Sequence, residues 1–68
     1  SKITEHDGHQ SDKEMIQILL DAQEQLSATL SGLEHVSSEN GDTLTEDLAV
    51  ERGRVHEKFA WMLRAHLA

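Results

Sequence analysis

The region that most constrains the fold of this chain is residues 40–67, which reads as one turn followed by one long amphipathic helix. Apolar side chains recur there at steps of four, seven, four and three residues, the period of a helix with one buried stripe. They are Leu44, Leu48, Val55, Phe59 and Met62. We therefore expect a helix over about residues 44–67 whose apolar stripe packs in a core.

A second stripe on the same helix has mostly small residues at its N-terminal end, and small residues let another backbone come close. Its members are Ala49, Gly53, His56, Ala60, Leu63 and Leu67. Trp61 lies outside both stripes. A helix with two such stripes and an extra Trp is expected to have more than one neighbour.

The preceding segment has the signals of a partner helix. Ser11 and Glu14 form a capping box, which predicts a helix over about residues 12–38 and a lead-in linker over residues 1–10. Helical spacing then relates Met15, Leu19, Ala22, Leu26, Leu30, Leu33 and Val36. The first two turns are apolar over most of the circumference, so a lone helical hairpin would expose several of these side chains, as interfaces do.

A short turn at Asn40-Gly41 separates the two periodic segments, and Asp42 or Thr43 is placed to cap the second helix. The short turn predicts an all-α, antiparallel helical hairpin over residues 11–68. Two helices cannot bury two wide apolar faces. A four-helix arrangement is the minimum, made from two copies or from this chain and another helical pair.

The composition excludes several classes of protein. The net charge is -7, with 13 acidic residues against 6 Lys and Arg, which disfavours non-specific DNA binding through phosphates. There is no Cys, and no apolar run approaches the roughly 20 residues that a membrane span needs. No hydrophobic leader follows Ser1, so we expect a cytoplasmic protein without a signal peptide.

The residues alone do not predict an oxidation site. Carboxylate-bridged di-iron sites in helical bundles use Glu-x-x-His, and no His here has a Glu three residues before it. His6 and His9 are weak surface candidates for a transition metal, and a solvated linker is the alternative. No catalytic residue is predicted.

Two runs carry a resemblance to a known family. Residues 41–48, GDTLTEDL, and residues 55–67, VHEKFAWMLRAHL, resemble the last helix of the Dps miniferritins. These ferritin-like proteins store iron and protect DNA in starved or oxidatively stressed cells. The resemblance implies the C-terminal half of a ferritin-like four-helix bundle, in a shell of usually twelve subunits that oxidises Fe(II). It also implies that the iron ligands lie on two earlier helices that are absent from this sequence.

The resemblance suggests roles for four residues. Asp47 matches an acidic residue that lines iron-entry pores in the family, with Glu46 and Glu51 as helpers; the alternative is acids that complement the helix dipole. Trp61 matches a Trp near the oxidation site, and the alternative is a packing anchor. The competing function for the whole chain is a non-enzymatic, self-associating hairpin that serves as an oligomerisation or scaffold module.

Overall fold

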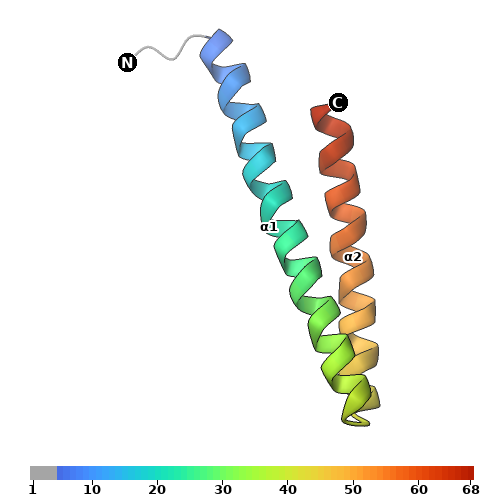
Figure 1. Ribbon diagram of the computed structural model, residues 1–68. Coiled ribbons are helices and arrows are strands. Elements are labelled where there is room, and N and C mark those ends of the chain that lie inside the picture. Colours follow the sequence, from blue (N-terminus) through green and yellow to red (C-terminus); the bar gives the residue numbers. More distant parts are fainter. Residues whose placement is uncertain (1–4) are drawn as a thin grey trace.

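Two long helices and one tight turn make up the described chain. The computed structural model describes residues 5–68, with side chains from residue 11 onward. Helix α1 spans Glu5–Glu39 and helix α2 spans Thr43–Leu67. They lie side by side and antiparallel, with the turn at one end and the start of α1 and the end of α2 at the other (Figure 1). The predicted antiparallel helical hairpin is confirmed, as are the bounds of its second helix to within a residue.

The start of α1 differs from the prediction. The helix begins at Glu5, so residues 5–10 are helical and the capping box at Ser11 and Glu14 lies inside the helix. Residues 1–4 of the predicted linker lie outside the described residues. The physical reason is that the segment contains no Pro, and its single Gly costs a helix only about 1 kcal/mol.

The turn closes as a Schellman motif. The Asp42 N–H donates to the Ser37 carbonyl at 2.9 Å, and the Gly41 N–H donates to the Ser38 carbonyl at 3.2 Å. Gly41 has φ of 71°, a left-handed conformation that glycine adopts without a steric penalty. Asp42 then caps α2 by accepting the Thr45 N–H at 3.1 Å. These bonds satisfy backbone groups of both helix ends within a few residues, which fixes the antiparallel return.

The helices meet along a regular seam, whose members are buried or half-buried and alternate at steps of three and four residues. This spacing is typical of two packed helices whose axes are nearly parallel. We define the seam as Ile16, Leu20, Gln23, Ser27, Leu30, Glu34 and Ser37 of α1, with Ala49, Gly53, His56, Ala60, Leu63 and Leu67 of α2.

The seam corrects the assignment of the core stripe. The stripe of α2 that packs on α1 is the one rich in small residues, whereas the stripe from Leu44 to Met62 is exposed in the hairpin. The buried apolar side chains among the described residues are Leu20, Ala49 and Ala60, at 6%, 3% and 2% exposure. Because their side chains are small, the residues of this stripe can pack against α1, the helix joined to α2 by the short turn. The thinnest extent of the molecule is 13 Å, close to the diameter of one helix, so the hairpin is a single layer.

Candidate functional site

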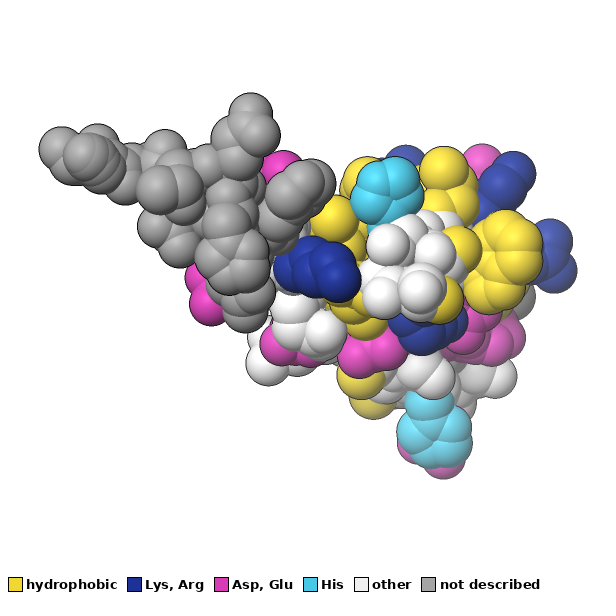
Figure 2. Space-filling view, turned by 90° about the horizontal axis from the view of Figure 1, so that it is seen from above, with side chains coloured by type: hydrophobic (Ala, Val, Ile, Leu, Met, Phe, Trp, Pro, Cys, Tyr) yellow, Lys and Arg dark blue, Asp and Glu magenta, His cyan; other side chains and the backbone are white. Residues whose placement is uncertain are grey.

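Large hydrophobic side chains form the most prominent surface of the hairpin. They are between 38% and 71% exposed. We call them the apolar face: Met15, Leu19, Leu26, Leu33 and Val36 of α1, with Leu44, Leu48, Val55, Phe59 and Met62 of α2. Seen from the open end of the hairpin, hydrophobic side chains reach the surface between charged ones (Figure 2). The predicted exposure of apolar residues in the first helix is confirmed.

The two stripes of the apolar face lie on the same side of the hairpin. Leu19 comes one residue before the seam residue Leu20, and Leu48 comes one residue before the seam residue Ala49. In antiparallel helices, the positions one residue before each seam contact project to one common side, and those one residue after project to the other. The stripes therefore make one continuous surface that spans both helices.

The opposite side of the hairpin is polar. The Arg64 Nη1 lies 2.7 Å from the Glu24 Oε2, and this ion pair joins the two helices across residues that each follow a seam position. Trp61 lies on the same side, is 65% exposed, and borders a surface hollow of about 490 Å³. Arg54, Glu57, Lys58 and Arg64 complete that hollow. Trp61 therefore does not act as a packing anchor within the hairpin, and both of its suggested roles stay predictions about a larger assembly.

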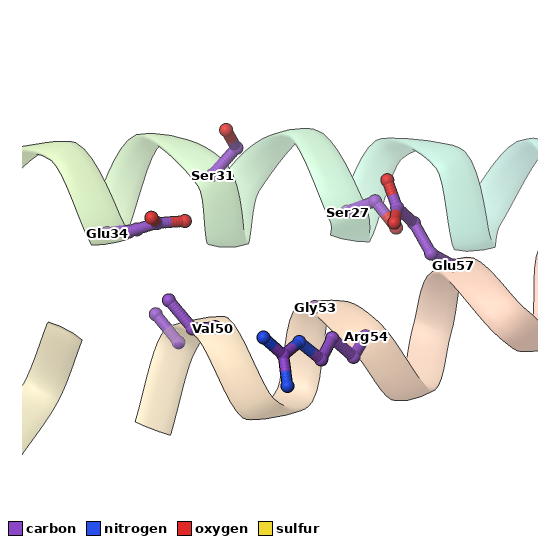
Figure 3. Close-up of a pocket in the computed structure, with 8 residues that line it drawn as sticks. Ser27, Ser31, Glu34, Val50, Gly53, Arg54 and Glu57 are labelled. Atoms are coloured by element: carbon purple, nitrogen blue, oxygen red, sulfur yellow. The ribbon is translucent and has the colours of Figure 1, made fainter. Parts of the chain in front are cut away.

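A groove of about 190 Å³ runs between the helices on this polar side (Figure 3). Ser27 of α1 and Gly53 of α2 leave it open because their side chains are small. Glu34, Arg54 and Glu57 carry opposite charges around it. Such mixed charges on an open groove are typical of a solvated helix face, and they offer no single-sign field for a charged ligand.

His56 makes the shortest side-chain hydrogen bond between the two helices. Its Nδ1 lies 2.6 Å from the Gln23 Oε1, and its Nε2 lies 3.3 Å from the Arg52 Nη2. Because the guanidinium can only donate, Nε2 accepts and the Nδ1–H donates to Gln23. His56 is therefore a hydrogen-bonded residue of the contact between the two helices. Gln23 was not predicted from the sequence as the partner of His56. Gln23 is a polar residue at helical spacing from the apolar residues of α1, and this pattern could have indicated a polar contact between the helices.

The three candidate pore acids lie together in the first turns of α2, next to the tight turn. Glu46 is half-buried, whereas Asp47 and Glu51 are exposed. Among the side chains of residues 11–68, none of the three has a Lys, Arg or His partner within ion-pair distance. Their carboxylates are therefore available to a cation from solvent, although one hairpin does not gather them into a binding site.

The described side chains do not build a metal centre. Among residues 11–68, no group of three or more His, Cys, Asp or Glu side chains is arranged to hold a metal ion. The side chains of His6 and His9 lie outside the described residues, so that candidate stays a prediction. Within the described part of the chain, neither helix is long and apolar enough to cross a membrane.

Comparison with known proteins adds one finding to this geometry. A protein-family model described as "Ferritin-like domain" matches residues 2–68, nearly the whole chain. Searches of curated proteins and of solved structures found no match.

Proposed function

Because the chain belongs to the ferritin-like domain family, we propose that it is the C-terminal half of a Dps-like miniferritin subunit. The assembled protein oxidises Fe(II) and stores Fe(III) in a shell. The main support for the proposal is that a chain of the ferritin-like family leaves a wide apolar face exposed. Ferritin-like bundles have four helices, and this hairpin has two and leaves one side uncovered.

In this proposal the chain has a supporting role in iron oxidation. The ligand set of residues 11–68 does not fit a resident di-iron centre, so we assign no oxidation step to this chain. Its contributions are the bundle core through the apolar face and subunit contacts through the polar side that carries Trp61. The iron ligands belong to the helical pair that completes the bundle.

The acids at the start of α2 are proposed to line the pores through which iron enters. Asp47 and Glu51 are exposed and have no cationic partner among the described side chains. A ring of such carboxylates around a symmetry axis focuses the field and raises the local concentration of Fe(II). Iron is the substrate and cargo in this scheme, and the pore acids act on its arrival and not on its oxidation.

The second candidate function is a non-enzymatic scaffold in which copies of the hairpin associate through the apolar face. It is favoured by the absence of a metal-ligand cluster among the described side chains. DNA protection, a property of the Dps family, is left out of the proposal because the net charge of -7 opposes phosphate binding. A cytoplasmic location stays a prediction.

The test is the native mass of the purified particle, the masses of its chains after denaturation, and its rate of Fe(II) oxidation. A miniferritin is expected to have a native mass many times the 7.6 kDa of this chain, to contain the helical pair that completes each bundle, and to oxidise Fe(II) faster than buffer. A particle built from this chain alone, with oxidation at the buffer rate, would establish the scaffold function and refute the ferroxidase proposal.

A further inference from the structure

The polar side of α2 carries a stripe that mixes charged and apolar residues. Its members recur at steps of three, four, three, four and three residues, the spacing of a helix that packs along another helix. All but the first follow a seam residue by one position, which places the stripe on the side of Trp61. We call it the mixed-charge stripe: Asp47, Val50, Arg54, Glu57, Trp61 and Arg64.

The order of residues in the mixed-charge stripe is complementary to its own reverse. Read from the start of α2, the order is acid, apolar, base, acid, aromatic, base. When a second copy of α2 lies antiparallel against the first, the outermost positions face each other, and so do the inner ones in turn. Every acid then faces a base, and the aromatic residue faces the apolar one. The facing pairs are Asp47 with Arg64, Val50 with Trp61, and Arg54 with Glu57.

Other alignments of two such stripes bring like charges together. A shift of one heptad sets Asp47 against Glu57 in one direction, and Arg54 against Arg64 in the other. A shift of half a heptad sets Arg54 or Glu57 against its own copy, and a parallel arrangement sets every charge against itself. Like charges that face each other across an interface oppose association. The stripe therefore favours one register of an antiparallel, two-fold symmetric pair.

The hairpin leaves the inner residues of the stripe available to such a partner. Trp61 is 65% exposed and Val50 is half-buried. Among the described side chains, neither Arg54 nor Glu57 has an ion-pair partner. Val50, Arg54 and Glu57 also border the groove between the helices (Figure 3). A Trp61 ring that packs on Val50 of another copy therefore also covers the edge of that groove.

The charge balance of the stripe differs from that of the whole chain. The chain has a net charge of -7, so two copies repel each other in general. The stripe has two acids and two bases and no net charge. We propose that the mixed-charge stripe binds the same stripe of a second copy of this chain, antiparallel about a two-fold axis, with Trp61 of each copy packed on Val50 of the other.

This inference rests on the part of the proposed function that assigns subunit contacts to the polar side. It adds the identity of the partner and the register of the contact. Arg64 is already held by Glu24 at 2.7 Å, so Asp47 lies at the rim of the interface and stays open to solvent, as its proposed pore role requires. The apolar face lies on the other side of the hairpin and remains free for the helical pair that completes the bundle.

The test uses the fluorescence of Trp61, the only Trp of the 68-residue chain. Quenching of Trp61 by acrylamide is measured over chain concentrations up to the millimolar range, and sedimentation equilibrium gives the mass of the species at each concentration. Association through the mixed-charge stripe protects Trp61 from the quencher. Association through the apolar face leaves Trp61 as accessible as it is in the single hairpin.

Charge reversal then tests the register. Arg54→Glu and Glu57→Arg each place two like-charge contacts in a two-fold pair, so each should weaken the association that protects Trp61 by at least about tenfold. Glu57→Arg makes the net charge less negative, so general repulsion between copies predicts the opposite change. An equimolar mixture of the two variants regains both ion pairs and should associate as tightly as the unmodified chain.

Two variants serve as controls, and circular dichroism monitors the helix content of all of them. Arg52→Glu makes the same charge change as Arg54→Glu, but outside the stripe, and should leave the protection of Trp61 unchanged. Glu57→Gln still accepts a hydrogen bond from Arg54 of the other copy and should weaken the association only slightly.

Three results would overturn the inference: a Trp61 that stays open to the quencher at every concentration of the unmodified chain, equal weakening by Arg52→Glu and Arg54→Glu, or a mixture of Arg54→Glu and Glu57→Arg that does not associate. None of these results depends on iron. Oxidation of Fe(II) by the native particle tests the proposed function separately, so failure of one can be told from failure of the other.

Discussion

The glycines of the two helices provide the sharpest test of the packing described above. A Cβ added at Gly53, in the seam, would meet no atom within 4 Å, and the same is true of Gly32 on the outer side of α1. Gly in the interior of a helix is less favourable than Ala by about 0.8–1.0 kcal/mol, because it loses more backbone entropy on folding. Gly53→Ala and Gly32→Ala should therefore each stabilise the fold by about 1 kcal/mol.

Gly41 provides the matched opposite case. An added Cβ also meets no atom within 4 Å there, but φ is +71°. In that conformation an L-residue suffers a clash between Cβ and its own backbone of about 1–2 kcal/mol. Gly41→Ala should therefore destabilise the fold, although the space around all three glycines is the same.

The assay is thermal unfolding followed by far-ultraviolet circular dichroism, with all variants at one protein concentration because association shifts the midpoint. For a domain of this size, 1 kcal/mol moves the midpoint by about 4–8 °C. Gly32→Ala and Gly53→Ala should raise it, and their effects should add, because the sites are on different helices and share no partner. A fall in the midpoint of Gly53→Ala with a rise in Gly32→Ala would refute the open seam. An unchanged midpoint in Gly41→Ala would refute the left-handed turn.

Three further predictions follow from the cap, the seam and the acids. Hydrogen bonds from the side chain and then the backbone of Thr45 hold the pKa of Asp42 below its usual value, so the stability this cap contributes is present at neutral pH and is lost as pH falls through that lowered pKa. Thermal melts across acidic pH should show this loss in the unmodified chain and not in Asp42→Asn, which still caps the helix. Leu20→Ala should cost about 2–5 kcal/mol in denaturant unfolding, whereas Ile18→Ala, at an exposed position, should stay within about 0.5 kcal/mol. In the intact particle, Asp47→Asn should slow the rate of iron uptake without changing the native mass, and a Glu57→Gln control should leave that rate unchanged; equal rates in both would contradict the pore role.

Much of the fold follows from local sequence signals. The Asn40-Gly41 pair and the cap at Asp42 predict the turn because each needs only its own backbone geometry. The bounds of α2 follow from apolar spacing for the same reason. The predicted start of α1 was wrong, because the helix begins at Glu5 and runs through the capping box. A capping box marks a place where a helix can begin, but it does not stop a helix that began earlier.

The periodicity of α2 does not predict which of its two stripes packs on α1 and which stays exposed. Spacing shows that Leu48 and Val55 share a face, and that Ala49 and Gly53 share another, but it does not show which neighbour each face meets. The structure places the stripe with the small residues, including the buried Ala49 and Ala60, against the helix joined by the short turn. The partner of His56 was missed because it lies 33 residues away on the other helix, a separation that no local pattern reports.

The hairpin is only 13 Å thick, about one helix, so both of its broad sides are in contact with water when nothing covers them. Any partner that binds the apolar face stabilises the paired helices by mass action, so the stability of the hairpin depends on the concentration of that partner. Until its cover arrives, the exposed apolar surface is open to chaperones and proteases, which act on chains that display such surfaces. In the proposed bundle, the steady amount of folded hairpin therefore depends on how readily the completing helical pair reaches the apolar face.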